Sequence, residues 1–246
     1  RNEPVLVNLN IETLLEPEGA GWVGNTGKVC TSAFGKTFGQ ELLVPVVAST
    51  LAHNDGGDDS VISAMEDMTM TLGDFMAVAS GTANNHTPTS YYLKDWHAAR
   101  SFRRNHEPEQ RRLYSVPDAF KDDWLDWFWR RCRKDSDDYR FLYVGTKGTS
   151  TGLHHDVVYS YSWSVNLTGR KLWTLYRPVT QVSPMDDSFN NHTDTRAGTG
   201  NDSGACIHVV QDIGEAIFVP SGWYHSVRNV VPSELETNNA APTGDD

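Results

Sequence analysis

From residue 139 onward the chain alternates short runs of β-prone residues with turn residues. Runs of this length, bounded by Gly, Pro, Asn and Ser, are typical of antiparallel strands. The pattern predicts a loop at 145–152, a hairpin joined at 168–170 and a tight turn at 220–222. The expected strands are 140–144, 159–167, 171–176, 207–210, 216–219 and 223–227. Many short strands in succession indicate a β-barrel or β-sandwich.

The first half of the chain mixes helices with strands. Short apolar runs at 42–47 and 91–93 predict strands, and Thr71 is the expected N-cap of a helix that turns Phe75 and Met76 toward the core. Apolar residues at helical spacing predict an amphipathic helix over 122–133. We therefore expect a mainly β fold with an α/β N-terminal flank and surrounding helices.

Length and the absence of repeats favour one domain. The chain has 246 residues, enough for a single core, and no linker divides it into two. We expect an N-terminal flank at about 1–138, a barrel core at about 139–231 and a polar tail at 232–246.

Composition limits the partners. The formal net charge of -11 argues against direct nucleic-acid binding, which depends on dense Lys and Arg. No apolar run is long enough to cross a membrane. Cys30, Cys132 and Cys206 are odd in number and widely spaced, which is typical of reduced thiols and predicts a cytoplasmic location, with the nucleus as the alternative. The sequence leaves the oligomeric state open.

A His-x-Asp motif carries the strongest chemical signal. At the start of a strand, His154 and Asp156 would point to one face while His155 points to the other. A third ligand must come from another strand, and His225 is the candidate. Two His and one carboxylate form the facial triad of non-haem Fe(II) oxygenases, which leaves positions open for a 2-oxo acid and dioxygen. His-x-Asp also occurs by chance, so the motif alone leaves ordinary structural roles open.

Two longer stretches resemble the signatures of JmjC-domain oxygenases. Residues 145–156, Gly-Thr-Lys-Gly-Thr-Ser-Thr-Gly-Leu-His-His-Asp, resemble the entry to that family's metal strand. Residues 212–225, which end in Pro-Ser-Gly-Trp-Tyr-His, resemble its second signature. The resemblance implies a double-stranded β-helix, a jelly-roll or cupin-like barrel. It also implies an Fe(II) held by His154, Asp156 and His225, and 2-oxoglutarate as cosubstrate.

The same resemblance implies a set of cosubstrate ligands. Lys171 matches the family's Gly-x-Lys pattern and would take the far carboxylate of 2-oxoglutarate. Tyr92, Thr151 and Ser164 match positions that supply hydrogen bonds to it in relatives. An exposed hairpin lysine is the alternative interpretation of Lys171.

Further stretches are similar to the jumonji-domain-containing-four branch: 38–39, 44–46, 91–97, 138–141 and 162–171. That resemblance implies a protein lysyl hydroxylase acting on a translation-termination release factor. The jumonji-six branch, a lysyl hydroxylase of splicing proteins, fits the Ser150-Thr151-Gly152 entry at least as well. A protein substrate is common to both.

The segment after His225 departs from the family pattern. Residues 232–246 are polar and predict no buried closing strand, so we expect an exposed sheet edge and a loosely held His225. Three other functions stay open: a lysine demethylase, a non-catalytic binding module with an incomplete barrel, and a cupin-like metalloenzyme without 2-oxoglutarate.

Overall fold

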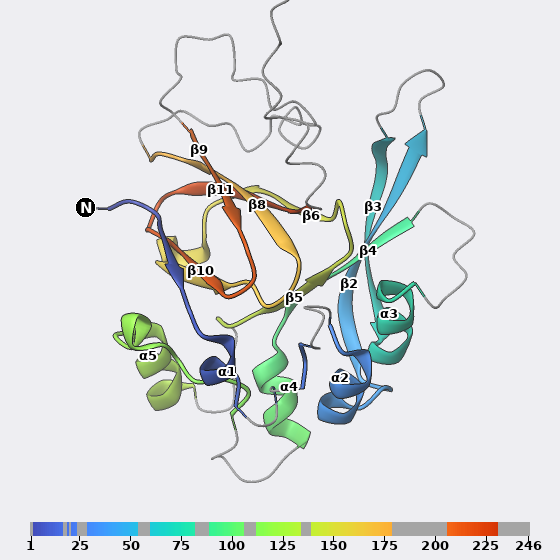
Figure 1. Cartoon of the computed structure of the whole chain (residues 1–246), viewed down its shortest axis with the longest axis horizontal. Coiled ribbons are helices and arrows are strands. Elements are labelled where there is room, and N and C mark those ends of the chain that lie inside the picture. Colours follow the sequence, from blue (N-terminus) through green and yellow to red (C-terminus); the bar gives the residue numbers. More distant parts are fainter. Residues whose placement is uncertain are drawn as a thin grey trace, which may run out of the picture. The chain divides into compact units, whose positions relative to one another are not determined.

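The computed structural model describes residues 2–16, 19, 21–23, 29–53, 60–81, 89–105, 112–133, 139–178 and 206–230. The chain forms two compact units (Figure 1). The first comprises Arg1–Asn8, His53–Val61 and Lys147–Asp246, and the second comprises Leu9–Ala52 and Ile62–Thr146. The predicted polar tail at 232–246 lies outside the described residues.

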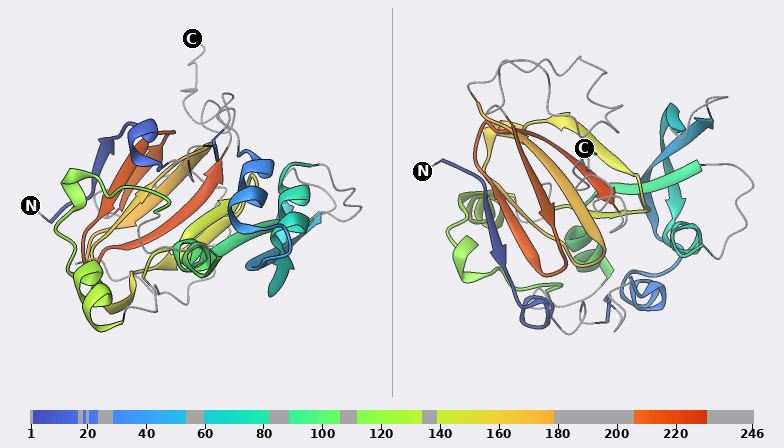
Figure 2. Two further views of the ribbon diagram at one scale, coloured as in Figure 1. Left: turned by 90° about the horizontal axis from the view of Figure 1, so that it is seen from below. Right: turned by 45° about the horizontal axis from the view of Figure 1, so that its top comes forward.

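The first unit is built from two antiparallel sheets (Figures 1 and 2). A three-stranded sheet has the order β1-β10-β7, and a four-stranded sheet has the order β6-β11-β8-β9. The strands are β1 (Val5–Asn8), β6 (Ser150–His154), β7 (Ser162–Val165), β8 (Arg170–Tyr176), β9 (Cys206–Gln211), β10 (Glu215–Val219) and β11 (Tyr224–Val230). From β6 to β11 the chain passes repeatedly from one sheet to the other, as in a jelly roll.

A shared apolar core joins these two sheets. Ile217 and Val219 on β10 cluster with Trp173 and Leu175 on β8, and Trp223 also belongs to this core. Burial of this kind is the main favourable term in folding. The expected mainly β, cupin-like fold is confirmed.

The predicted hairpin at 168–170 is wrong. β7 pairs with β10, whereas β8 pairs with β11 and β9, so the connection crosses between the sheets. Asn166 holds this corner: its buried side-chain amide donates to the carbonyls of Gly169 at 2.9 Å and Gln211 at 3.3 Å. Gly169 has a φ of 65°, which suits glycine in a sharp turn. A turn signal in sequence does not say which sheet the next strand joins.

Other boundaries also differ from the prediction. The strand expected over 159–167 is confined to β7, which covers only Ser162–Val165. Residues 150–152, expected in a loop, belong to β6 because they pair with β11. The last strand continues past Val227 to Val230. In the four-stranded sheet β11 lies between β6 and β8, so it is an inner strand. The expectation that His225 lies at a loose sheet edge is therefore wrong.

The second unit contains the helices and another antiparallel sheet of order β3-β2-β4-β5. Thr71 caps its third helix as predicted, with its hydroxyl oxygen accepting from the Asp74 amide at 3.1 Å, and Phe75 and Met76 are buried. Among the described residues, no helix is long and apolar enough to cross a membrane. The elements are α1 (Ile11–Leu14), α2 (Thr31–Phe38), β2 (Leu43–His53), β3 (Ser60–Thr71), α3 (Leu72–Ala79), β4 (Thr89–Trp96), α4 (Ala98–Asn105), η1 (Asp118–Phe120), α5 (Trp124–Cys132) and β5 (Leu142–Gly145).

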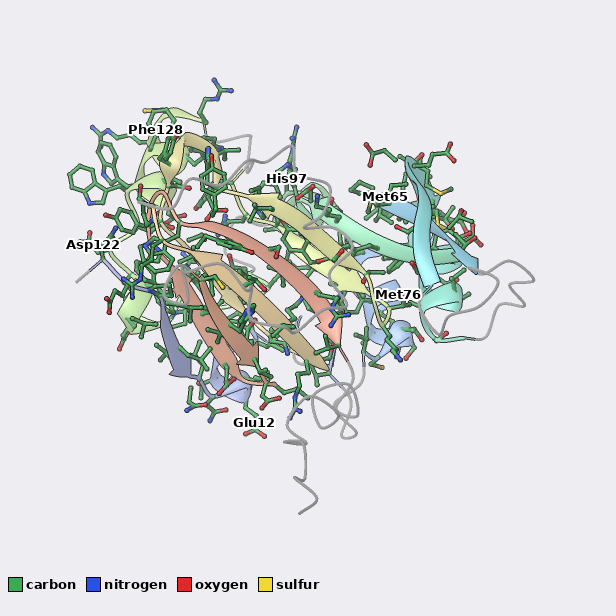
Figure 3. The ribbon with its side chains drawn as sticks, turned by 90° about the horizontal axis from the view of Figure 1, so that it is seen from above. Glu12, Met65, Met76, His97, Asp122 and Phe128 are labelled. Carbon is green, nitrogen blue, oxygen red and sulfur yellow. The ribbon has the colours of Figure 1, made fainter. Side chains whose placement is uncertain are left out.

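Helix α5 forms where predicted, but its apolar face is not buried. Asp123 caps it by accepting from the Asp126 amide at 3.0 Å. Trp124, Trp127 and Phe128 nevertheless remain 79%, 60% and 42% exposed, and Figure 3 labels Phe128 on this helix. Helical spacing predicts which side chains share a face, and it does not predict what covers that face.

One buried amide links the strands of both sheets in the first unit. Gln211 on β9 is fully buried. Its Nε2 donates to the carbonyls of Ser164 on β7 and Glu215 on β10, both at 2.8 Å. Its Oε1 accepts from Trp173 Nε1 on β8 at 2.8 Å. One side chain therefore binds three polar groups on three different strands, and the buried Trp173 N–H in particular would be costly to leave unpaired.

We expect Gln211→Leu to lower the free energy of unfolding by about 2–4 kcal/mol, because it leaves the Trp173 N–H without its acceptor and removes one hydrogen bond from each of two carbonyls. Urea unfolding monitored by Trp fluorescence measures the change. Ile213→Ala, at a 44% exposed position nearby, should change it by less than about 0.5 kcal/mol. Equal midpoints for the two variants would contradict the bridging role of Gln211.

Candidate metal centre

Strand pairing places two of the predicted ligands against each other. His225 on β11 lies directly opposite His154 on β6 in the antiparallel register. Side chains of directly opposed residues emerge on the same face of a sheet. The two imidazole rings are 4.3 Å apart between centroids. The ladder is irregular between His225 and Val227.

Asp156 joins this pair from outside the strand. β6 ends at His154, and Asp156 is the N-cap residue of the short turn η2 (Val157–Tyr159). The expectation that His154 and Asp156 share a face by strand alternation is therefore wrong, although the two side chains do converge. Asp156 Oδ1 is 4.0 Å from His225 Nε2. Ser162 Oγ on β7 donates to Asp156 Oδ2 at 2.5 Å, which leaves Oδ1 to face the imidazoles.

Backbone carbonyls fix the orientation of both imidazoles. His154 Nδ1 is 2.9 Å from the Gly152 carbonyl, and His225 Nδ1 is 3.2 Å from the Trp223 carbonyl. In a neutral imidazole the nitrogen beside a carbonyl carries the proton, so the other nitrogen keeps a free lone pair. Both Nε2 atoms are thus prepared to bind a metal, in the usual arrangement of metal-ligating histidines.

The electrostatics keep His225 neutral. Burial lowers the pKa of His225, which is only 4% exposed, and the neighbouring His154 lowers it further. The Asp156 carboxylate acts in the opposite direction and is the weaker influence. A neutral imidazole is the form that binds metal ions.

The donor set fits a divalent iron. His154, Asp156 and His225 each offer one ligand atom, and these atoms lie within 4.8 Å of one another. Two imidazole nitrogens and one carboxylate oxygen on one side of an ion leave its other positions open, as in facial-triad Fe(II) sites. A structural zinc site would instead be closed by a fourth protein ligand.

Lys171 lies on the same inner surface as the triad. On β8 it is directly opposite Asn229 of β11, four residues beyond His225 and on the same face of that strand. Its Nζ donates to Asn229 Oδ1 at 3.0 Å, and Asn229 Nδ2 donates to Thr149 Oγ1 at 2.9 Å. Burial of the amino group lowers the pKa of Lys171 to about 8. These contacts rule out the alternative of an exposed hairpin lysine.

The other predicted cosubstrate ligands are spread over three strands. Thr151 lies on β6 opposite Val227. Ser164 lies on β7 in the other sheet, where its carbonyl accepts from Gln211. Tyr92 is a buried residue on β4 of the second unit. Their roles as cosubstrate ligands stay predictions.

Three polar residues around the site were not predicted from the sequence. Ser162 donates to Asp156, Asn229 accepts from the Lys171 amine, and Thr149 accepts from the Asn229 amide. Asn229 could have been found from the sequence. It lies four residues after the candidate ligand His225, and residues four apart on a strand share a face. Ser162 gave no such signal, since its contact depends on a sheet crossing.

Comparisons with known proteins agree with this geometry. The model of the family described as Cupin-like domain matches residues 35–241. The 2-oxoglutarate and iron-dependent oxygenase JMJD4 of Danio rerio is 43% identical over 148 residues, which are 56% of this chain and 33% of that protein. The human JMJD4 is 38% identical over 148 residues, 56% of this chain and 34% of that protein. The arginine-specific demethylase JMJ20 of Arabidopsis thaliana is 30% identical over 252 aligned residues, 94% of this chain and 50% of that protein.

These matches confirm the resemblance to JmjC-domain oxygenases and to the jumonji-domain-containing-four branch. The similarity applies to only part of each relative, because the matched segments cover between a third and a half of the relatives' own lengths.

We expect Ser162→Ala to weaken metal binding about 10- to 100-fold, because Asp156 loses the hydrogen bond that orients its carboxylate. Titration of the purified protein with Mn(II), followed by electron paramagnetic resonance, measures the affinity. Ser160→Ala, on the same segment, is the control and should bind as the wild type does. Unchanged affinity in Ser162→Ala would show that the fold alone orients Asp156.

We expect Lys171→Met to raise the free energy of unfolding at neutral pH by about 1–3 kcal/mol, because it removes a buried charge. The lost hydrogen bond to Asn229 offsets part of this gain. The folded-state pKa is about 8 and the ordinary value is 10.5, so between these values the unfolded chain binds more protons. Wild-type stability should therefore rise with pH across that interval, and this rise should be smaller in Lys171→Met.

Urea unfolding between neutral pH and about pH 10 measures both effects of the Lys171 change. Lys147→Met, at an exposed position in the same unit, is the matched control. If the free energy of unfolding of the wild type rises with pH no more steeply than that of Lys171→Met, the Lys171 amine is solvated.

Proposed function

Because this chain belongs to the cupin-like domain family, we propose that it is an Fe(II)- and 2-oxoglutarate-dependent oxygenase. The observation that carries the proposal is the set of three converging ligand atoms on His154, Asp156 and His225. Each of these side chains also has its second polar atom satisfied, by Gly152, Ser162 and Trp223 respectively. The free atoms are thus preorganised, and a metal ion can bind without repositioning them.

When bound, Fe(II) and 2-oxoglutarate would supply the oxidative chemistry with dioxygen as oxidant: one oxygen atom would enter succinate as 2-oxoglutarate loses CO2, and the other would enter a substrate C–H bond. The chain's own residues hold the reactants in place and keep water out. Trp173 lies with its ring centroid 5.6 Å from that of His225, and its indole is only 6% exposed. An apolar wall of this kind strengthens the electrostatic interactions inside the site.

Lys171 is the proposed partner for the far carboxylate of 2-oxoglutarate. A buried ammonium without a counter-ion is costly, which is why its pKa falls to about 8. A bound carboxylate would supply that counter-ion and favour the charged amine. Asn229 and Thr149 hold the amine in position before the ligand arrives. Thr151 and Ser164, in the same unit, are the further candidates for contacts with 2-oxoglutarate.

The proposed substrate is a protein side chain, and the proposed reaction is lysyl hydroxylation. Two of the relatives described above are named 2-oxoglutarate and iron-dependent oxygenase JMJD4. The resemblance to that branch suggests a translation-termination release factor as the target. The net charge of -11 suits a basic segment as substrate. A cytoplasmic location is consistent with Cys30, Cys132 and Cys206, which are all free thiols.

Demethylation is the second candidate function. The relative aligned over 94% of this chain is named an arginine-specific demethylase. Both reactions would use the same triad, and they differ in the carbon that is oxidised. Oxidation of an N-methyl group releases formaldehyde, whereas hydroxylation leaves the added oxygen on the substrate.

The decisive test of the metal site is spectroscopic. Anaerobic addition of Fe(II) and 2-oxoglutarate should produce a weak metal-to-ligand charge-transfer band in the visible range. His154→Ala and Asp156→Ala should abolish the band, while His208→Ala, a histidine on β9 bonded to Thr174, should retain it. No band in folded wild-type protein would refute the oxygenase proposal.

The products separate the two reactions. On exposure to air with the purified release factor, the wild type should release succinate and add the mass of one oxygen to a lysine. Formaldehyde from a methylated peptide, without that mass gain, would favour the demethylase. Succinate release that no protein substrate stimulates would leave the oxygenase standing and refute the release factor as target.

A further inference from the structure

An exposed apolar segment follows the metal ligand Asp156 directly. Val157, Val158 and Tyr159, the three residues of η2, are 71%, 86% and 60% exposed. None of the three carries a charge at neutral pH. Exposed apolar side chains that adjoin one another commonly mark a binding surface, whereas isolated ones are ordinary. We call these three residues the apolar lip.

The backbone of the lip adopts a strained conformation. Val158 has φ 59° and ψ 18°, and Tyr159 has φ 51°, so both lie in the left-handed region. A β-branched residue there is a genuine outlier, since glycine or asparagine fits without steric conflict. Val158 gains almost no burial in return, because it is 86% exposed. Strain without compensating burial points to a role outside folding.

The lip is nevertheless fixed in place. The Tyr159 amide donates to the Asp156 carbonyl at 3.2 Å, and the Tyr159 carbonyl accepts from Ser221 Oγ at 2.6 Å. The Tyr159 ring stacks on His155, with centroids 4.4 Å apart and planes 16° apart. Ser221 belongs to the turn that precedes His225. The lip is thus tied to both segments that bear metal ligands.

Its position relative to the triad sets what it can contact. Val158 is two residues from Asp156, so the two Cα atoms are at most about 7.6 Å apart. An extended peptide advances about 3.3–3.6 Å per residue. A substrate residue about two positions from the one being oxidised therefore comes within reach of Val158. The uncharged, apolar surface selects an apolar side chain at that position.

We propose that the apolar lip binds a hydrophobic side chain of the polypeptide substrate, about two residues from the target residue. This inference rests on the proposed function, because it takes the triad as the reaction centre. The strained backbone holds Val158 out from the protein surface, where a substrate side chain can cover it. Burial of a valine against such a side chain is sufficient to change affinity about tenfold.

The test uses the 246-residue chain with Fe(II) and 2-oxoglutarate under anaerobic conditions, so that peptides bind without reacting. The probe is an array of lysine-centred and arginine-centred peptides in which each flanking position within about three residues carries either leucine or serine. We expect the wild type to bind peptides with leucine at one of these positions about tenfold more tightly than their serine counterparts.

Four variants separate the apolar contact from the strain. Val158→Gly and Val158→Asn both fit the left-handed backbone and remove the apolar surface, so both should lose the preference for leucine while their thermal midpoints stay equal or rise. Val158→Leu retains the apolar surface and should keep the preference. Ile213→Gly, at another exposed apolar position of the same unit, should also keep it.

Several outcomes would overturn the lip as a substrate contact. These are a leucine preference that persists in Val158→Gly, a wild type that binds no peptide or shows no preference, and a change of oligomeric state in Val158→Gly on size-exclusion chromatography. The last would mean that the lip contacts a second copy of the chain.

Admitting air to the same samples tests the proposed function separately. Leucine-dependent binding without succinate release or peptide modification would refute the oxygenase and leave the lip in place. Peptide modification that is the same in the wild type and in Val158→Gly would support the oxygenase and refute the lip as a substrate contact.

Discussion

The pairing of β11 with β6 on one side and β8 on the other is the constraint on which the candidate site depends. The first pairing sets His225 against His154, and the second sets Asn229 against Lys171. Because residues 225 and 229 share a face, one strand presents both a proposed metal ligand and the hydrogen-bond partner of Lys171, the lysine proposed to bind the cosubstrate. Their Cα atoms are separated by about 13 Å along the strand, at about 3.3 Å per residue. A single register therefore sets the spacing between the converging ligand atoms and the amine of Lys171.

The sequence predicted most of the strands and the residues of the triad, and physical reasons explain where it failed. Alternating apolar and turn residues are local signals, so they located β8, β9, β10 and β11 well. The choice of sheet is not local: the turn before Lys171 leads across to the other sheet because Asn166 binds Gly169 and Gln211 there. Ser162 and Gln211 have contacts that exist only because the chain passes between the two sheets, and no spacing rule could have revealed them.

Helix α5 shows a different limit of sequence reasoning. Its amphipathic spacing is a local property and was predicted, whereas the spacing did not show that Trp124 and Trp127 stay exposed. In the apolar lip, too, the local sequence does not predict the observed structure. Nothing in Val157-Val158-Tyr159 predicts a left-handed turn, since β-branched and aromatic residues favour strands. The turn forms because Asp156 and Ser221 bind its two ends, and the structure overrides the local preference.

The position of β11 also changes the argument about the stability of the site. An unusual segment after His225 suggested a strand at an open edge, where fraying would displace the third ligand. Instead β11 pairs along both sides, and His225 is only 4% exposed. Its Nδ1 is bound within its own segment, to Trp223, and Asp156 is held by Ser162 from the other sheet. The contacts that fix all three ligand atoms thus come from residues between Gly152 and Val230, and the geometry of the triad is set within this unit.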